Sequence, residues 1–507
     1  MLVKVLSSSL LGLSACIVDV EVDISSGMPG TCIVGLADKS VEEAKERVKT
    51  SIKNMGFVYP QKKIVINLAP ADLKKSGSHF DLPIAVGILS ASEQLLTKNL
   101  NKFLIFGELS IDGILRKVNG SLCYAISAKE NGIEAIILPR ENAKEASLVK
   151  GVKIYPAENL KDVVNIINNY PNIEPYINND EGLENDNNYI YDFQDIKGNV
   201  MPKRALEIAA AGNHNILMIG PPGSGKTLLA RSLPSILPDL TFEEALECTK
   251  IYSVAGLLTK GTLIKNRPFR NPHHSVSYAG MIGGGTPPRP GEVVLANNGV
   301  LFIDELLEFK RNILETLRTP LEDRQVTISR VLNSVTYPAN FMLVAALNPC
   351  PCGYNGDKYK QCICSNNQIL RYWSKLSAPI MDRIDIHIEV SRLSNDEIIS
   401  NKNSESSKQI RSRVNKAREI QLKRFKEIGI YSNSQMQSKH IKQFCKLNEA
   451  SIELLKTAIN KLSLSARGYD RILKLSRTIA DLENSENVET RHVAEAIQYR
   501  TLDRNRF

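Results

Sequence analysis

The sequence predicts an α/β protein in three parts, and the prediction rests on how apolar residues alternate along its 507 residues. Residues 193–395 alternate apolar strands with helical stretches, which is the pattern of a mostly parallel sheet covered by helices. Residues 1–165 mix strands and helices in a second α/β unit, whereas residues 396–507 carry the helical period alone. Several cores are expected, because one domain usually takes about 100–200 residues.

The first unit is predicted to begin with strands. Residues 14–24 alternate in the manner of a half-buried strand. Leu13–Cys16 also mimics a lipoprotein cleavage box, but Ser7–Ser9 interrupts the apolar stretch before it, so we favour the strand. One helix and three strands follow, the helix with its apolar face at Val41, Ala44, Val48 and Ile52, the strands at residues 64–66, 105–107 and 135–138.

Residues 166–192 are predicted to be a linker between the two α/β units. Asparagine is abundant there, lysine and arginine are absent, and acidic residues recur. A segment of this composition buries little apolar surface, so it gains little by folding.

Composition and charge restrict the class of protein. Hydrophobic residues make up 43% of the chain and charged residues 23%, as in soluble globular proteins. No apolar run reaches the roughly 18 residues that a membrane span requires. The net charge of +9 is concentrated in residues 401–507, which hold 22 lysines and arginines against 12 acidic residues. This surplus favours an anionic partner, foremost nucleic acid, although a solvated helical surface explains it equally well. In this helical region Thr490 is the predicted N-cap of the last helix.

A phosphate-binding loop is predicted where an apolar strand at residues 216–219 ends. Residues 220–227 read Gly-Pro-Pro-Gly-Ser-Gly-Lys-Thr and fit the pattern G-x-x-x-x-G-K-[ST]. In this pattern the glycines let backbone N–H groups close around phosphate oxygens, the lysine reaches the β- and γ-phosphates, and the hydroxyl coordinates Mg²⁺. The predicted ATP-binding residues are Gly220, Pro221, Pro222, Gly223, Ser224, Gly225, Lys226, Thr227 and Leu228.

Two further strands end in polar side chains. Residues 300–305 form an apolar strand that ends in two carboxylates. We expect Asp304 to hold Mg²⁺ together with Thr227, and Glu305 to orient and deprotonate the attacking water. The strand at residues 341–347 ends at Asn348, which can hold that water or touch the γ-phosphate; an asparagine that caps a turn is equally compatible.

Four of the nine cysteines are clustered. They form two C-x-C pairs, Cys350 with Cys352 and Cys362 with Cys364. Four thiolates suit tetrahedral zinc, and we favour zinc over free thiols although C-x-C is tighter than the usual C-x-x-C. An odd total with one cluster fits a reducing compartment, the cytoplasm, better than a disulfide framework.

Together these motifs resemble the AAA+ superfamily, and longer segments resemble its magnesium-chelatase-like ATPases. Those segments are residues 267–274, 283–285, 289–292, 298–308, 348–353 and 380–385. In the first unit, Asn-Leu-Ala-Pro-Ala at 67–71 and Phe-Asp-Leu-Pro-Ile at 80–84 narrow the resemblance to the YifB/ComM branch. The resemblance covers nearly the whole chain.

The resemblance implies a fold and further site residues. The fold is a P-loop core with hairpin insertions, a C-terminal helical lid and an N-terminal domain like the protease domain of Lon (ribosomal S5 domain 2-like). Asn348 becomes sensor 1, Arg383 the arginine finger that reaches a neighbouring subunit's ATP, and Arg467 sensor 2, with Arg471 as second candidate. A guanidinium opposite the γ-phosphate stabilises the charge that develops during transfer. For each arginine, a surface or lid salt bridge is the alternative.

Two insertions are expected in the core. Residues 256–292 are predicted to form a loop that faces the pore of the ring, and residues 325–337 a second hairpin. Basic pore loops would contact phosphates without reading base sequence. The basic residues of the first insertion are Arg267, Arg270, His273, His274 and Arg289.

The resemblance to Lon raises the question of proteolysis. Residues 106–113 resemble a strand and turn of Lon, which needs a serine–lysine dyad. Alignment places His79 near the nucleophile's position and Tyr124 near the lysine's. We therefore expect no proteolysis, and a domain that binds DNA or a partner. Other residues of the required types lie nearby, at Ser76, Ser78 and Lys117.

The motifs are compatible with three functions. The YifB/ComM branch is similar to a DNA helicase that drives branch migration in natural transformation, which favours an ATP-hydrolysing ring motor, usually a hexamer, on single-stranded or branched DNA. A protein remodeller of the chelatase type is the alternative; it shares the core motifs but not the Lon-like N-terminal domain. A scaffold that binds nucleotide without turnover is disfavoured by intact Lys226, Asp304, Glu305 and Arg383.

Overall fold

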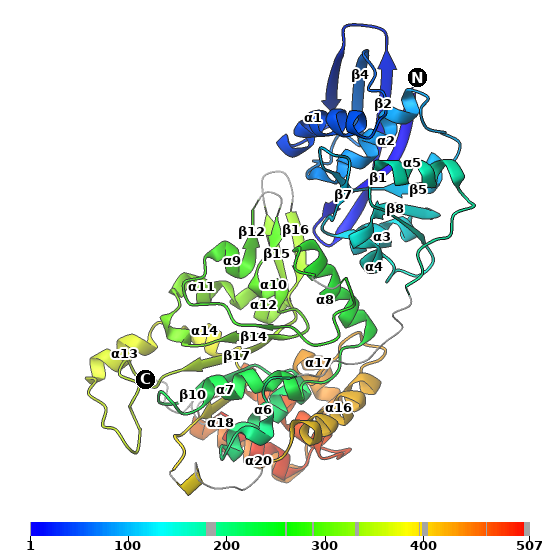
Figure 1. Ribbon diagram of the computed structural model, residues 1–507. Helices are drawn as coiled ribbons and strands as arrows, with labels where there is room; N and C mark the ends of the chain where they lie inside the picture. The colour runs from blue at the N-terminus through cyan, green and yellow to red at the C-terminus, as the bar shows by residue number, and fades with distance from the viewer. Residues whose placement is uncertain are drawn as a thin grey trace.

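In the described residues, the fold has two large sheets, three two-stranded sheets and a helical region. The computed structural model describes residues 2–178, 189–258, 261–285, 288–329, 334–394, 396–397, 404–462 and 464–500. A seven-stranded sheet belongs to the N-terminal part and a five-stranded sheet to the middle of the chain. Figure 1 shows the N-terminal part in blue and cyan above the green core, with the orange and red C-terminal helices below. Within the described ranges, no helix has both the length and the apolar character for a membrane crossing.

The N-terminal sheet is mixed and has helices on both faces. Its strand order is β3-β4-β2-β1-β5-β8-β9. Strand β2 is antiparallel to both β4 and β1, whereas β3 is parallel to β4 and the pairings from β1 through β5 and β8 to β9 are parallel. The strands are β1 Leu2–Leu11, β2 Ser14–Ser25, β3 Gly30–Val34, β4 Lys63–Ala69, β5 Phe103–Ile105, β8 Ala135–Pro139 and β9 Lys153–Ala157, with a small hairpin of β6 Glu108–Leu109 and β7 Leu115–Arg116. The helices are α1 Lys39–Asn54, α2 Asp81–Ala91, α3 Ser121–Glu130, α4 Arg140–Ala146 and α5 Leu160–Asn169.

The apolar pattern explains this packing. Val18, Val20 and Val22 of β2 are fully buried, as the alternation predicted, and so is the predicted apolar face of α1. One core lies between the sheet and α1, α2 and α5, and a second lies against α3 and α4. The strand predicted at 105–107 ends earlier, because β5 stops at Ile105.

The N-terminal fold continues beyond residue 165. Helix α5 runs to Asn169, and Tyr170 packs edge-on against Phe103 with ring centroids 4.8 Å apart. The start of the predicted linker is therefore part of the N-terminal core. Of the remainder, residues 179–188 lie outside the described residues.

The core sheet is parallel throughout, as predicted. Its order is β11-β14-β17-β10-β18, so the strand before the phosphate-binding loop lies between β17 and β18. The strands are β10 Ile216–Ile219, β11 Phe269–Arg270, β14 Val300–Ile303, β17 Met342–Leu347 and β18 Ile386–Glu389. The helices of this part are α6 Val200–Gly212, α7 Lys226–Ser232, α8 Phe242–Val254, α9 Tyr278–Ile282, α10 Glu292–Leu295, α11 Arg311–Thr316, α12 Arg318–Asp323, α13 Asn366–Trp373 and α14 Ala378–Met381.

Two hairpins extend from the core. The first pairs β12 Gly283–Gly284 with β13 Arg289–Pro290, and the second pairs β15 Gln325–Ser329 with β16 Ser334–Pro338. The second confirms the hairpin predicted at 325–337, although residues 330–333 lie outside the described part of the chain. The turn between β1 and β2 packs on this hairpin: a Cβ at Gly12 would come within 2.4 Å of Val335.

All the regular secondary structure described in the C-terminal region is helical, as predicted. Its helices are α16 Ser407–Arg424, α17 Ser438–Phe444, α18 Glu449–Leu462, α19 Ala466–Leu482 and α20 Thr490–Gln498. They share one apolar core with α6, α7 and one face of the parallel sheet. The predicted N-cap of the last helix is wrong by one residue. Glu489 is the N-cap of α20, and its backbone N–H donates to the side chain of His492, as in a capping box. The Thr490 hydroxyl instead contacts Ser451 at 3.1 Å.

Candidate functional site

The predicted phosphate-binding loop lies between β10 and α7, and its glycines are required by its backbone conformation and, at Gly220, by a close contact. Gly223 and Gly225 have φ of +77° and +91°, a region that residues with a Cβ rarely adopt. A Cβ at Gly220 would lie 2.1 Å from the carbonyl oxygen of Val390. The loop therefore needs glycine for its shape and for its close approach to the chain after β18. All nine predicted ATP-binding residues, 220–228, lie in this loop and the first turn of α7.

Lys226 is held inside the loop. Its Nζ donates to the carbonyl oxygens of Gly220 at 2.6 Å and Pro221 at 3.0 Å, and to Oδ1 of Asn348 at 3.3 Å. Burial lowers the pKa of Lys226 to about 8, against the opposing effect of Asp304 and Glu305. Burial thus destabilises the charged form of the Lys226 ammonium group, and an anionic ligand would stabilise it.

The acidic pair, Asp304 and Glu305, directly follows β14. In the sheet, β17 lies between β14 and β10. Thr227 Oγ1 donates to Oδ2 of Asp304 at 2.8 Å, so the two expected Mg²⁺ ligands already meet. Glu305 is exposed and has φ of +50°, which is uncommon for a residue with a side chain. Backbone strain of this kind concentrates at functional sites. The carboxyl ends of β10, β14 and β17 thus bring Lys226, Thr227, Asp304, Glu305 and Asn348 to one edge of the sheet.

The predicted arginines lie at the opposite edge. Arg383 precedes β18, and its carbonyl oxygen accepts from Nδ2 of Asn215, the residue before β10, at 2.8 Å. Because β10 and β18 are parallel and in register, the residues before them and the phosphate-binding loop after β10 are at opposite ends of the strands. The structure therefore does not bring Arg383 to the nucleotide loop of its own chain.

Arg383 and Arg467 share one carboxylate. Arg383 is 9% exposed and forms an ion pair with Glu322 of α12, and Arg467 Nη2 lies 3.5 Å from the same carboxylate. Burial, and then the neighbouring guanidinium groups of Arg467, Arg318 and Arg471, lower the pKa of Arg383. Glu322 was not anticipated from the sequence, because nothing in its local pattern distinguishes it from a surface acid.

Arg471 has a different partner. It forms an ion pair with Asp385, which also accepts from the backbone N–H of Asn215 at 3.1 Å and lies 3.4 Å from His214 Nδ1. Burial alone would raise the pKa of Asp385, but Arg471 and His214 outweigh it and hold that pKa well below its usual range. Arg471 thus connects α19 to the residues that precede β10 and β18. In the sequence, Asp385 could have been identified as a functional residue only by its position in the motif at residues 380–385.

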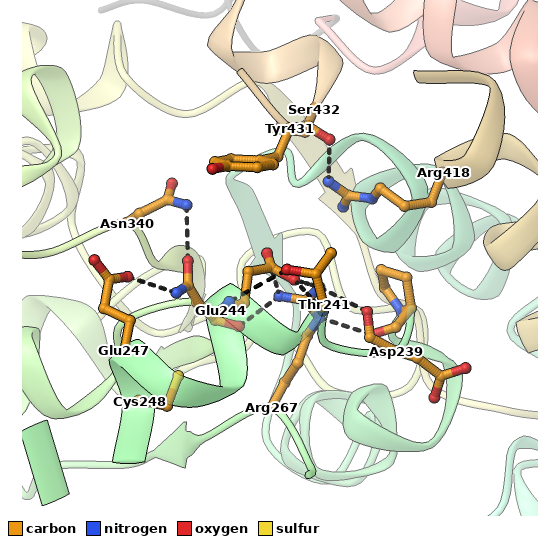
Figure 2. A network of polar contacts seen from close by, with 12 residues as sticks. Asp239, Thr241, Glu244, Glu247, Cys248, Arg267, Asn340, Arg418, Tyr431 and Ser432 are labelled. Atoms are coloured by element: carbon orange, nitrogen blue, oxygen red, sulfur yellow. Dashed lines mark hydrogen bonds and ion pairs between the residues drawn. The ribbon is translucent and has the colours of Figure 1, made fainter. Parts of the chain in front are cut away.

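Two arginines of the expected pore loop have internal partners instead. Figure 2 shows Arg267 beside Glu244 of α8, to which it donates at 2.8 Å. Arg267 also donates to the carbonyl oxygen of Asn298 at 2.7 Å. The same view shows Arg418 of α16 donating to the carbonyl oxygen of Tyr431 at 2.8 Å. Arg270 pairs with both carboxylate oxygens of Glu292 at 2.7 Å. Because Arg267 and Arg270 are neutralised within the fold, they hold it together here rather than offer charge to a phosphate.

The cysteine cluster is assembled. The sulfur of Cys350 lies 3.4 Å from that of Cys352 and 3.6 Å from that of Cys362. All four thiols, including that of Cys364, lie within 4.8 Å of one another. The two C-x-C pairs, separated in sequence, form one site directly after Asn348.

In the N-terminal unit, the two positions aligned with the Lon dyad touch each other. The rings of His79 and Tyr124 have centroids 5.4 Å apart, and His79 Nε2 pairs with the carbonyl oxygen of Ser8 at 2.9 Å. Burial lowers the pKa of His79 to about 4, so the ring is neutral at physiological pH. The aligned pair forms a buried aromatic contact.

Comparison with known proteins matches almost the whole chain. Three family models match: "Magnesium chelatase, subunit ChlI" at residues 192–398, "Subunit ChlI of Mg-chelatase" at 20–142 and "Magnesium chelatase, subunit ChlI C-terminal" at 404–500. Competence protein ComM of Haemophilus influenzae is 44% identical over 99% of this chain and 97% of its own length. The protein YifB of Escherichia coli is 43% identical over 97% of this chain and 96% of its own.

A more distant likeness is also found. The Lon protease of the Aster yellows witches'-broom phytoplasma is 25% identical over 157 residues, which cover 28% of this chain and 20% of that protein. This likeness is partial, whereas those to ComM and YifB extend over both full lengths. The chain belongs to the YifB/ComM family of magnesium-chelatase-like AAA+ proteins.

Proposed function

We propose that this chain is an ATPase that works as a ring on DNA. The observation that carries the proposal is the convergence of a glycine-lined loop, a buried lysine, a hydroxyl–carboxylate pair and an amide at the carboxyl edge of one parallel sheet. Each of these groups has a partner in ATP hydrolysis, and together they are difficult to explain as a folding device, because the buried cation lowers stability.

The residues suit ATP with Mg²⁺. The backbone of residues 220–225 would surround the phosphates, and Lys226 would exchange its carbonyl partners for phosphate oxygens. Thr227 and Asp304 would hold Mg²⁺, which when bound neutralises phosphate charge. Exposed Glu305 would take the proton of the attacking water, and Asn348 would orient that water or contact the γ-phosphate. The hydrogen bonds of Lys226 to Asn348 and of Thr227 to Asp304 support this assignment.

The arginines support a ring. Arg383 and Arg467 lie together at the edge of the sheet opposite the nucleotide loop, so they would complete a neighbour's site rather than their own. A guanidinium supplied by the next subunit couples hydrolysis to assembly. Glu322, which contacts both, would hold them until the neighbour's phosphates compete for them. We propose six subunits per ring, because rings of this family are usually hexamers.

DNA is the proposed partner. The relative from Haemophilus influenzae is named a competence protein, and the C-terminal region carries the basic surplus. A remodeller of another protein is the second candidate, because all three matching family models describe a magnesium chelatase subunit. For the N-terminal unit we propose a binding role without peptide hydrolysis, supported by the buried contact of His79 with Tyr124. Peptidase activity lost in Ser78→Ala would overturn that part.

Single-stranded DNA is expected to raise the ATPase rate severalfold, and the stimulation should weaken as salt rises, because phosphate contacts release counterions. The measurement is a coupled ATPase assay with and without DNA across ionic strengths, with a branched duplex as a second ligand. A rate indifferent to both nucleic acids would favour the protein remodeller. Absence of turnover in the purified assembled protein would favour a scaffold.

The affinity for ATP is expected to decrease with rising pH above about 8. Free Lys226 loses its proton there because its pKa is lowered to about 8, whereas bound phosphate restores the charge. Binding then takes up a proton, so affinity should fall by up to about tenfold per pH unit above the free pKa and stay constant below it. Titration of a fluorescent ATP analogue from about pH 7 to pH 9.5 measures this. In Lys226→Arg the cation stays charged, so any remaining affinity should be independent of pH.

A further inference from the structure

The loop at residues 350–364 joins two functional regions. It leaves the sheet at Asn348, reaches the phosphate-binding loop, and returns to α13. Gly353, with φ of +85°, packs directly on Pro222: a Cβ at this glycine would lie 2.6 Å from Cδ of that proline. The loop therefore packs against the predicted phosphate-binding loop, although the two are more than 120 residues apart in sequence.

Arg392 connects the same loop with Pro222 a second time. Its Nε donates to the carbonyl oxygen of Pro222 at 3.3 Å, and its Nη1 lies 3.5 Å from the carboxylate of Asp357. Its guanidinium also stacks on the ring of Tyr354, 5.2 Å from the centroid. The position of Pro222, and with it the phosphate-binding loop, thus depends on where residues 353–357 are held.

This loop has little apolar anchoring of its own. Tyr359 and Ile363 are 60% and 88% exposed, and no helix or strand lies between β17 and α13 in this described segment. The indole N–H of Trp373 donates to the carbonyl oxygen of Pro349 at 3.0 Å, at the base of the loop. What closes the loop is the meeting of the two C-x-C pairs.

The geometry of the four thiols fits one tetrahedral metal ion. Tetrahedral Zn–S bonds of about 2.3 Å place the sulfurs about 3.8 Å apart, close to the 3.4–3.6 Å between Cys350, Cys352 and Cys362. In a 2Fe–2S or 4Fe–4S cluster the four cysteines are divided among two or four irons, so all four sulfurs would not lie within 4.8 Å of one another. Backbone N–H groups also point at the sulfurs: that of Asn355 lies 3.3 Å from Cys350 Sγ, and that of Cys352 lies 3.4 Å from Cys364 Sγ. Such donors stabilise thiolates.

We propose that Cys350, Cys352, Cys362 and Cys364 hold one zinc ion whose function is to fix Gly353, Tyr354 and Asp357 against the phosphate-binding loop. With four sulfur ligands the site is closed, so the ion is structural and takes no part in hydrolysis. The metal site stands on its own geometry; its effect on nucleotide binding rests on the proposed ATPase function.

The metal is tested first, without nucleotide. Full-length protein purified without chelator is expected to carry one zinc per chain by elemental analysis, and cobalt substitution should give the spectrum of tetrahedral thiolate coordination. Cys362→Ser and Cys364→Ser should lose the metal, whereas Cys364→His, which keeps a zinc ligand, should retain it. Cys32→Ser removes an exposed cysteine elsewhere and serves as the matched control. A metal-free protein with four free thiols or two disulfides would overturn the site.

The coupling is tested with a variant that leaves the thiols intact. Tyr354→Ala is expected to keep its zinc but bind the fluorescent nucleotide about tenfold more weakly, the size expected for a partly desolvated cation–π contact with Arg392 that positions the loop. The metal-free Cys364→Ser protein should be weakened at least as much. Nucleotide affinity equal to that of the unmodified protein in both variants would refute the coupling and leave the zinc site standing. A zinc-loaded protein that binds no nucleotide at all would instead refute the ATPase proposal.

Discussion

Glu305→Gln is expected to reduce ATP hydrolysis by about 10²–10⁴-fold, the usual contribution of a positioned general base. Binding of ATP should persist, because Lys226 keeps its contact with the loop backbone, Thr227 keeps its contact with Asp304, and glutamine preserves the shape of the side chain. The variant should therefore accumulate in the ATP-bound state. Turnover in a coupled assay and retention of radiolabelled nucleotide measure the two effects separately.

Glu308→Gln provides the matched control for Glu305→Gln. Glu308 is also exposed and lies in the same turn, but it is the last residue of the short helix Leu306–Glu308 rather than the one directly after Asp304. Its substitution removes the same charge from the same surface, so the rate should stay close to that of the unmodified protein. Equal losses in both variants would show that general surface charge, and not a base at position 305, controls the rate.

Arg383→Ala is expected to bind ATP normally and to lose about 10³–10⁵-fold in turnover, the range associated with an arginine that stabilises charge on the transferred phosphoryl group. Binding should be preserved because Arg383 lies at the edge of the sheet opposite its own nucleotide loop. The ion pair with Glu322 is also lost, so a thermal unfolding curve must accompany the assay. Arg140→Ala, which removes an exposed ion pair of the N-terminal unit, is the control.

Mixing two inactive variants separates action on a neighbour from action within one chain. Arg383→Ala subunits keep their own Lys226, Asp304 and Glu305, and Glu305→Gln subunits keep Arg383. In a mixed ring, some interfaces combine an intact nucleotide site with an intact arginine from the next subunit, so part of the activity should return. If Arg383 served its own chain, every site in the mixture would remain defective and the rate would stay at the level of the separate variants.

Local motifs were predictable because their chemistry is contiguous in sequence. The phosphate-binding loop needs glycines, a lysine and a hydroxyl within eight positions, so its pattern is visible without a structure. The parallel core sheet followed from apolar periodicity and the second hairpin from the family resemblance, and both are confirmed. The spacing of the four cysteines also predicted a cluster, and in the structure their four thiols lie close together. At Thr490, however, periodicity could not fix a helix start to one residue, and Glu489 is the cap.

Partners distant in sequence were not predictable. The sequence marks Arg267 and Arg270 as conspicuous basic residues, but only the fold shows that Glu244 and Glu292 neutralise them. Arg383 and Arg467 are separated by more than eighty positions, and their shared contact with Glu322 depends on how α12, the start of β18 and α19 pack. Arginine and glutamate are common on protein surfaces, so the sequence does not show which of them form an ion pair.

The sequence by itself determined the class of the protein and the chemistry of its loop, because those depend on side chains held at fixed spacing by a few consecutive peptide bonds. The tertiary structure decided the order of the strands, the separation of Lys226 and Arg383 to opposite edges of one sheet, and the contact of Gly353 with Pro222. These features depend on which strands pair and which faces pack. Strand pairing and packing join residues far apart in the chain, and the energy of such contacts is shared among many side chains rather than carried by one pattern.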